Sequence, residues 1–477
     1  MRRNRKRLTL SLLLCLVLLL CACGEPIAMI GSHWNERGEL VLEMSDGSIL
    51  NAGSPTDAVE DPQGLAFHEL PDGTWGVSAG TADQLLTLTV PATHRGEPVT
   101  MVMENGFAGA AVRKITLPDS ITEIGAGAFS GSALITVELP AALETIGEDA
   151  FGQCYGLVRV SLPATLVKIG TGAFSSCPKL VEVENRSALK LTAGQSDHGY
   201  VAYNAQNIYT PKEGESKLSV TADGYVFLDV KRCFLMGYTG TQTALTLPAD
   251  CDGKPYNVYR CAFYGMAELT EVVVPEGVGS VGERAFMNCT ALRSVKLPQT
   301  LTRLGGYAFA ECRALRELTL PAAPEAIDYA AFYHCDGIKH TEGNVVYVGT
   351  VMIDIVDNTA PFTLRADTTA IFQQAFYRAG VGPVILPEGV LSIGAEAFYL
   401  TKAELIYVPA SVTYLDTGAF TECRNVPIYY GGGVENSALW RYVSLTQGTE
   451  LYYYSEQAPT VEGNFWHYDA EGNMQVW

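Results

Sequence analysis

The stretch "SLPATLVKIGTGAFSSC", residues 161–177, decides the fold, because the chain repeats its pattern many times. Close variants are "ELPAALETIGEDAFGQC", residues 138–154, and "KLPQTLTRLGGYAFAEC", residues 296–312. Each variant places a proline, an aliphatic residue, a glycine, an Ala-Phe pair and a cysteine at the same or closely similar offsets. Self-similarity at a fixed short period indicates an array of stacked repeats.

The phenylalanine of the pattern serves as an anchor and sets a period of 22 or 23 residues within each array. The anchors form three groups: Phe107, Phe129, Phe151 and Phe174, then Phe263, Phe286, Phe309 and Phe332, then Phe376, Phe398 and Phe420. The residue five positions before each anchor is always aliphatic, and the residue directly before it is alanine at every anchor except Phe107. We therefore predict three arrays of coils with one shared core pattern.

Each coil has a physical interpretation. Residues 157–162, "LVRVSL", alternate between apolar and polar side chains, which predicts a short strand. Pro163 ends that strand because it lacks the N–H that a ladder needs. Gly170 is placed where a tight turn or a close approach of two backbones is needed. One coil cannot bury its apolar side alone, so neighbouring coils must stack and share a core.

The full pattern, L-x-x-V-x-L-P-x-x-[LV]-x-x-I-G-x-x-A-F-x-x-C, resembles the BspA-like leucine-rich repeat of bacterial surface proteins. The resemblance covers Phe107 to Cys423 with two interruptions. Local departures are Asp328 and Asp416 at the glycine position, and Ser132, Met266, Ala379 and Thr401 at the cysteine position. The resemblance implies a β-rich solenoid, a leucine-rich repeat array of 22–23-residue coils with β-hairpin entry segments and a C-terminal aromatic cap. It also implies adhesion or protein binding at a cell surface.

The N-terminus has the features of an export signal. "MRRNRKR" is basic, and the apolar run from Leu8 to Ala22 is shorter than a membrane-spanning helix requires. The following "LCACGE" resembles a bacterial lipobox, which implies cleavage before Cys23 and a lipid on its thiol. The predicted location is the outer face of the cytoplasmic membrane, or the outer membrane of a Gram-negative source. The alternative is an ordinary cleaved signal with incidental cysteines.

The interruptions divide the chain into segments. The two alternating runs around Asp46-Gly47 predict a β-hairpin. Two later segments, residues 224–265 and 72–109, resemble each other and each precede an array, so they are interpreted as β-rich entry segments. The predicted division is a signal peptide at 1–22, a lipid-anchored linker with the hairpin at 23–60, three entry segments with their arrays at 61–185, 186–342 and 343–430, and a C-terminal cap at 431–477.

Composition and motifs argue against catalysis. A formal net charge of −20 makes nucleic acid an unsuitable partner and leaves the lipid as the expected membrane contact. The chain contains no C-x-x-C or H-E-x-x-H motif. "GVGSVG", residues 277–282, matches a dinucleotide-binding pattern, but Gly282 is the repeat glycine and no βαβ unit follows. We predict a non-enzymatic protein with no catalytic residue, metal or cofactor.

The cysteines follow the repeat register. Six of them lie three residues after an anchor: Cys154, Cys177, Cys289, Cys312, Cys335 and Cys423. That register predicts small buried thiols, and ladder geometry rarely suits a disulfide. Cys233, Cys251 and Cys261 fall in the second entry segment, where one bridge is compatible with an oxidising compartment.

Function is expected on the outward side of the strands, because these residues differ from coil to coil while the core positions repeat. The candidate partner-binding face consists of Lys114, Thr136, Glu138, Arg159, Ser161, Glu182, Glu271, Ser294, Lys296, Glu317 and Thr319. The expected partner is an extracellular protein of a host or of a bacterial surface, bound on a concave strand face. The simpler alternative is that these are solvated strand residues without a partner.

The C-terminal aromatic residues allow a second functional hypothesis. Trp440, Tyr453, Trp466 and Tyr468 could form a stacking platform for an extracellular glycan. Their other interpretation, which we prefer, is a cap that closes the open end of the solenoid, because large aromatic side chains bury well against an exposed core.

Overall fold

The structure is a computed structural model that describes residues 29–34, 40–44, 49–51, 63–321, 324–380 and 382–477. The predicted signal peptide and Cys23, the predicted site of lipidation, lie outside these residues. Near the N-terminus, β1 (Met29–Trp34) and β3 (Ile49–Asn51) both pair with β2 (Leu40–Met44) in antiparallel fashion. Strands β2 and β3 lie on either side of Asp46-Gly47.

From residue 63 onward, the described part of the chain is a β-solenoid whose coils each contribute two short strands. The strand before the repeat proline and the strand before the repeat glycine enter two separate parallel ladders. In the first array, one ladder contains β6 (Thr87–Thr89), β9 (Lys114–Thr116), β11 (Thr136–Glu138), β13 (Arg159–Leu162), β15 (Glu182–Asn185) and β16 (Asn207–Tyr209). The other contains β8 (Glu97–Val102), β10 (Glu123–Ile124), β12 (Thr145–Ile146) and β14 (Lys168–Ile169). The solenoid predicted from the repeat is therefore confirmed.

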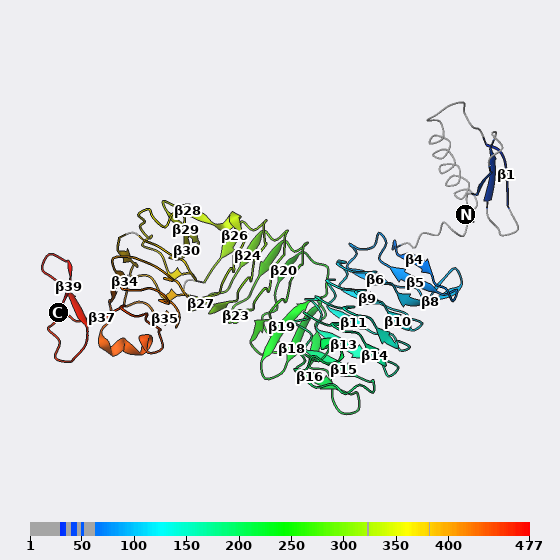
Figure 1. Cartoon of the computed structure of the whole chain (residues 1–477), viewed down its shortest axis with the longest axis horizontal. Helices are drawn as coiled ribbons and strands as arrows, with labels where there is room; N and C mark the ends of the chain where they lie inside the picture. The colour runs from blue at the N-terminus through cyan, green and yellow to red at the C-terminus, as the bar shows by residue number, and fades with distance from the viewer. Residues whose placement is uncertain (1–28, 35–39, 45–48, 52–62, 322–323, 381) are drawn as a thin grey trace.

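The second array has the same arrangement. One ladder contains β20 (Ala244–Thr246), β22 (Glu271–Val273), β24 (Ser294–Lys296) and β26 (Glu317–Thr319). The other contains β21 (Tyr256–Val258), β23 (Ser280–Val281), β25 (Arg303–Leu304) and β27 (Ala326–Ile327). The third array contains β31 (Ala370–Ile371), β33 (Ser392–Ile393) and β35 (Tyr414–Leu415), beside β32 (Val384–Ile385), β34 (Ile406–Val408) and β36 (Ile428–Tyr430). Figure 1 shows the arrays following one another along the chain.

Antiparallel strands open each array. The first entry segment pairs β4 (Ala66–Glu69) with β5 (Trp75–Ser78), and β7 (Thr93–His94) pairs with β8. The second contains β17 (Leu218–Val220), β18 (Tyr225–Asp229) and β19 (Cys233–Tyr238). The third contains β28 (His340–Glu342), β29 (Val345–Val348) and β30 (Val351–Ile355). One strand of each segment (β5, β19 or β30) then pairs in parallel with the first strand of the following ladder (β8, β21 or β31), so the entry segment provides the edge on which the array grows.

The anchors form the core as ladders of stacked rings. Ring centroids are 5.0 Å apart for Phe151 and Phe174 and 4.8 Å apart for Phe263 and Phe286. The repeat glycine permits this spacing: a Cβ on Gly147 would lie 2.5 Å from the backbone nitrogen of Ala126 in the preceding coil. The glycine therefore serves close backbone approach, the second of its two predicted roles.

The first array is longer than predicted. Strand β16 adds to β15 in parallel, with Glu182 opposite Asn207, so the ladder continues past the predicted boundary at residue 185. The short 3-10 helix η1 (His198–Tyr200) takes the place of an anchor turn in this last coil, and Gly199 accepts a hydrogen bond from the backbone of Phe174. The repeat pattern does not indicate this coil, because it carries no anchor phenylalanine.

The second array docks sideways on the first. Ile135, Val158 and Val181 occupy the same repeat position on one flank of the first array, and β18 and β19 cover them with Val226, Leu228 and Met236. Figure 1 places β18 and β19 beside β13 and β15. The corresponding positions in the second array are polar: Thr270, Arg293 and Arg316. Burial of this apolar column is the physical reason for the docking.

The C-terminal segment closes the last array. The 3-10 helix η3 (Val434–Trp440) places the Trp440 ring 5.7 Å from that of Phe420, where a further anchor would stack. Beyond it, β37 (Leu451–Tyr454) and β38 (Phe465–Tyr468) extend the ladder of β36, and β39 (Met474–Val476) ends it with an antiparallel pair. The aromatic segment is thus continuous with the solenoid, as expected of a cap. A third 3-10 helix, η2 (Asp336–Ile338), follows the last coil of the second array.

Candidate partner-binding face

The strands before the repeat prolines place the predicted binding residues in regular columns. Glu271 lies opposite Ser294, which lies opposite Glu317, and the inward Val272 lies opposite Val295. Lys296 and Thr319 form a second outward column two residues further along the strands. Because the ladders are parallel and in register, outward side chains of successive coils are neighbours on one surface.

Most of the predicted face is accessible. In the described chain, Lys114, Glu138, Glu271, Lys296, Glu317 and Thr319 are exposed, and Thr136, Arg159 and Ser294 are partly buried. The exposed residues carry both signs of charge, and they change type between adjacent coils. The surface of β20, β22, β24 and β26 therefore presents a mixed polar pattern without a uniform charge.

Two predicted face residues are buried, and the prediction that they are accessible is wrong. Ser161 is 8% exposed and Glu182 is 0% exposed. The segment after β16 covers Glu182: Ser216 donates its hydroxyl to Oε1 at 2.6 Å, and the backbone N–H of Lys217 donates to Oε2 at 2.7 Å. The carboxylate thus holds the connection between the first two arrays and is not available to a partner.

Arg159 belongs to the same buried network. Its Nη2 lies 2.5 Å from Oε2 of Glu184, and Nη2 of Arg186 lies 2.5 Å from Oε1 of the same carboxylate. Burial acts to raise the pKa of Glu184, but the hydrogen bonds from Arg186 and Arg159 outweigh it and leave that pKa below its ordinary value. Buried paired charges of this kind fix local geometry, so Arg159 has a structural partner at this position.

The C-terminal aromatic platform is not available as predicted. Trp440 is 6% exposed and Trp466 is 0% exposed, whereas Tyr468 is 46% exposed and Tyr453 is partly buried. The indole N–H of Trp466 donates to the carbonyl oxygen of Tyr430 at 2.8 Å. Two of the four proposed stacking surfaces therefore lie inside the protein, where they support the cap.

The repeat cysteines are free, buried thiols, as predicted. The thiols of Cys154, Cys177, Cys289, Cys312 and Cys335 each donate to the carbonyl oxygen of the anchor phenylalanine one coil earlier, at 2.9–3.1 Å. Thr401, at the same repeat position, donates its hydroxyl to Phe376 at 2.8 Å. Burial raises the pKa of Cys154 to about 11 and that of Cys423 to about 12, so these thiols stay protonated at neutral pH.

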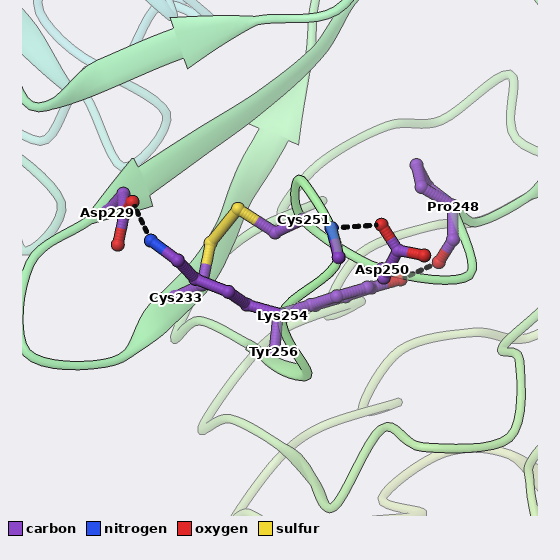
Figure 2. The surroundings of a disulfide bond; sticks show 8 residues. Asp229, Cys233, Pro248, Asp250, Cys251, Lys254 and Tyr256 are labelled. Carbon is purple, nitrogen blue, oxygen red and sulfur yellow. Dashed lines mark hydrogen bonds and ion pairs between the residues drawn. A yellow bond between two sulfur atoms is a disulfide. The ribbon is translucent and has the colours of Figure 1, made fainter.

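One disulfide joins Cys233 of β19 to Cys251 in the loop before β21. Figure 2 shows this bond between two further contacts: Lys254 pairs with Asp229 at 2.6 Å, and the Tyr256 hydroxyl donates to the carbonyl oxygen of Pro248 at 2.6 Å. The sequence left open one bridge among Cys233, Cys251 and Cys261, and the structure forms it between the first two, with Cys261 free. It ties the loop to the edge strand on which the second array grows.

The described residues contain no group of three or more His, Cys, Asp or Glu side chains arranged to hold a metal ion. His334 and Glu311 pair at 2.7 Å on the surface, at the end of the second array. No helix in the described part of the chain has the length and apolar character needed to cross a membrane.

The docked arrays enclose a cavity that the sequence did not predict. It has a volume of about 470 Å³ and is lined from the first array by Ala111, Ala133, Gly156 and Lys179, and from the second by Ala262, Tyr264 and Met266, with Arg113 and Glu268 paired at its side. One sequence signal could have indicated this cavity: Lys179 stands at a repeat position where the earlier coils carry the small residues Ala111, Ala133 and Gly156.

Comparison with known proteins places the repeats in a described family. Residues 93–195, 256–350 and 356–428, more than half of the chain, match the BspA type leucine-rich repeat region in six copies. No curated protein matches the chain in sequence.

Three solved structures illustrate the similarity. A leucine-rich cell surface protein from Faecalibacterium prausnitzii is 19% identical, with 81% of this chain and 97% of that one covered and a TM-score of 0.25. A leucine-rich repeat protein from Eubacterium ventriosum is 17% identical, with coverage of 80% and 96% and a TM-score of 0.31. The pneumococcal vaccine antigen PcpA is 16% identical, with coverage of 89% and 94% and a TM-score of 0.24.

Proposed function

The chain belongs to the BspA type leucine-rich repeat family, and we propose that it is a non-enzymatic cell-surface scaffold that binds an extracellular protein. Binding takes place on the outward side of the strands before the repeat prolines, chiefly Glu271, Ser294, Lys296, Glu317 and Thr319. Lys114 and Glu138 extend the face onto the first array. A lipid on Cys23 holds the scaffold at the membrane.

The observation that carries this proposal is the contrast between the two sides of one ladder. The inward residues are alike, with Val272 and Val295 buried in the core and Leu318 packed against it, while the outward residues opposite one another differ in charge and size. Core packing explains why the inward residues are alike, but it does not constrain the type of the outward residues. A regular array of accessible, varied side chains is what an extended protein-binding surface requires.

Charge reversal on this face tests the proposal. The double variant Glu271→Lys with Glu317→Lys changes the proposed face, and Glu123→Lys with Glu144→Lys changes the other side of the solenoid by the same net charge. Both pairs are exposed, so thermal stability should change little. Binding to an extracellular protein identified with the unaltered chain should weaken at least about tenfold in the first variant only, since interfacial charges contribute on this scale. Equal affinity of both variants would place the binding surface elsewhere.

A further inference from the structure

The cavity between the first two arrays contains a buried cation without a carboxylate partner. Lys179 is 1% exposed, and its Nζ donates to the carbonyl oxygen of Met236 at 2.7 Å and to that of Ala262 at 3.1 Å. An ammonium group carries three protons, so two carbonyl acceptors leave one N–H unused. Within the described chain, no carboxylate forms an ion pair with Lys179, although a buried charge normally has one.

The surrounding backbone is shaped around this ammonium group. Val226 pairs with Gly237 and Phe227 pairs with Leu235, so Met236 is the extra residue of a β-bulge whose carbonyl oxygen meets Lys179. Bulges redirect backbone groups in this way and are common beside functional sites. At Gly237 a Cβ would lie 3.1 Å from the carbonyl oxygen of Ala262, which accepts from Lys179, so a side chain there would press on one of the two acceptors of the ammonium group.

The cavity itself has the form of a small-molecule site. Its rim includes Gln84, Gly265 and Ala267, which are exposed, and it extends inward to Lys179 and Ala262, which are buried. Ala111, Ala133 and Gly156 leave one wall free of large side chains. A volume of about 470 Å³, a mostly apolar lining and a few fixed polar groups at a junction between two structural units are typical of ligand pockets.

We propose that this cavity binds an amphipathic monocarboxylate, with its alkyl or aryl body along the Ala111–Gly156 wall and its carboxylate on Lys179. The carboxylate accepts the third N–H of the ammonium group and supplies the missing counter-charge. Arg113 differs from Lys179 in already having a counter-charge, because its guanidinium pairs with Glu268 and also donates to the carbonyl oxygen of Gly240 at 3.1 Å.

Protonation gives the binding a distinctive signature. Burial lowers the pKa of Lys179 from 10.5 to about 7, and electrostatic interaction with Cys261 acts in the opposite direction. Burial raises the pKa of both Cys261 and Tyr264, so these groups keep their protons at neutral pH. A carboxylate needs the charged amine, so binding above pH 7 must take up a proton.

The experiment is titration calorimetry on the full chain with 4-phenylbutanoate and, as the neutral control, 4-phenylbutanamide. We expect the carboxylate to bind and the amide to bind at least about tenfold more weakly, as for loss of one charge-assisted contact. Affinity for the carboxylate should fall by about tenfold per pH unit above pH 7, with proton uptake in buffers of different ionisation enthalpy. No binding of 4-phenylbutanoate, or equal affinity for acid and amide, would overturn the proposal.

Two variants locate the site. Lys179→Met keeps the length of the side chain and should abolish the preference for the acid. Ala133→Leu fills the cavity from the wall of the first array, two coils before Lys179, and should weaken both probes while Lys179 is unchanged. If Lys179→Met does not fold, the location of the site is tested by Ala133→Leu alone. Undiminished binding of 4-phenylbutanoate by that variant would place the ligand outside the cavity.

Discussion

The thiol of Cys289 donates a hydrogen bond to the carbonyl oxygen of Phe263, 3.1 Å away in the preceding coil. The same carbonyl oxygen also accepts the backbone N–H of Met266. The repeat cysteine therefore acts both as a small apolar side chain and as a weak donor that satisfies a second lone pair. Thr401 makes the equivalent contact with Phe376 at this repeat position, whereas Ser132 contacts Sγ of Cys154.

The contribution of a side-chain donor at this repeat position to stability can be measured at Thr401, where the donor can be removed without changing the shape of the side chain. Thr401→Val keeps the branched side chain but loses the hydrogen bond to Phe376, whose carbonyl oxygen retains only its backbone partner. We predict a loss of about 1 kcal/mol in the free energy of unfolding, because one net hydrogen bond contributes on that scale. Denaturant titration measures it, with Thr401→Ser as the control that keeps the donor. A variant as stable as the parent would show that the bond contributes nothing.

The anchor ladder should be sensitive to truncation. Phe309 is fully buried between Phe286 and Phe332, with ring centroids at 5.2 and 6.5 Å. Phe309→Ala should cost about 3–5 kcal/mol in unfolding free energy, since it leaves a cavity between two coils. Phe309→Leu should cost less because it fills most of that space. Equal stability of parent and alanine variant would place this ring outside the core.

The disulfide should stabilise the second array. Cys233 and Cys251 are 18 residues apart, and a closed loop of this length contributes about 3 kcal/mol by limiting the unfolded chain. The double variant Cys233→Ala with Cys251→Ala should therefore unfold at lower temperature. A reducing agent should lower the melting temperature of the parent and leave that of the double variant unchanged. If the reducing agent shifts both equally, the effect comes from another site.

Lys179 should make stability depend on pH. Its lowered pKa means that the folded chain binds fewer protons than the unfolded chain between about pH 7 and pH 10.5. Stability contributed by this group therefore rises with pH across that window and is lost as pH falls to 7. The difference in unfolding free energy between the parent and Lys179→Met, measured at pH 6, 7.5 and 9, should favour the variant most at pH 6. A difference that is constant with pH would contradict the buried, unpaired amine.

Lipidation is tested at Cys23. Cells that express the full chain with a labelled fatty acid should incorporate the label into the protein, and Cys23→Ala should abolish it. Cys21→Ala is the matched control, because Leu20 makes a poor residue before the cleavage point. Label retained in Cys23→Ala would exclude this residue as the lipid attachment site.

The second strand of each coil was not predicted because it is too short to show a pattern. Glu123–Ile124 and Thr145–Ile146 are strands of two residues, and alternation needs at least four to be recognised. The sequence identified the aliphatic residue at this position but could not say that it belongs to a ladder. Only the stacking of coils gives such short segments their hydrogen-bond partners.

The candidate face was predicted in position but not in accessibility. The period of two correctly separates outward from inward residues, as Glu271 and Val272 illustrate. It carries no information about Ser216 and Lys217, which come from a later connection and cover Glu182. Contacts between distant segments decide which outward residues meet solvent.

The sequence by itself determined the coil, its period, the stacked phenylalanines, the buried thiols and the closing cap, because each depends on residues at fixed offsets within one repeat or its neighbour. Tertiary structure alone decided how the arrays meet. The apolar column of Ile135, Val158 and Val181 needed a partner surface, and β18 and β19 supplied it from outside the repeat. That docking buried Lys179 and formed the cavity beside it, because burial depends on contacts between segments far apart in the chain.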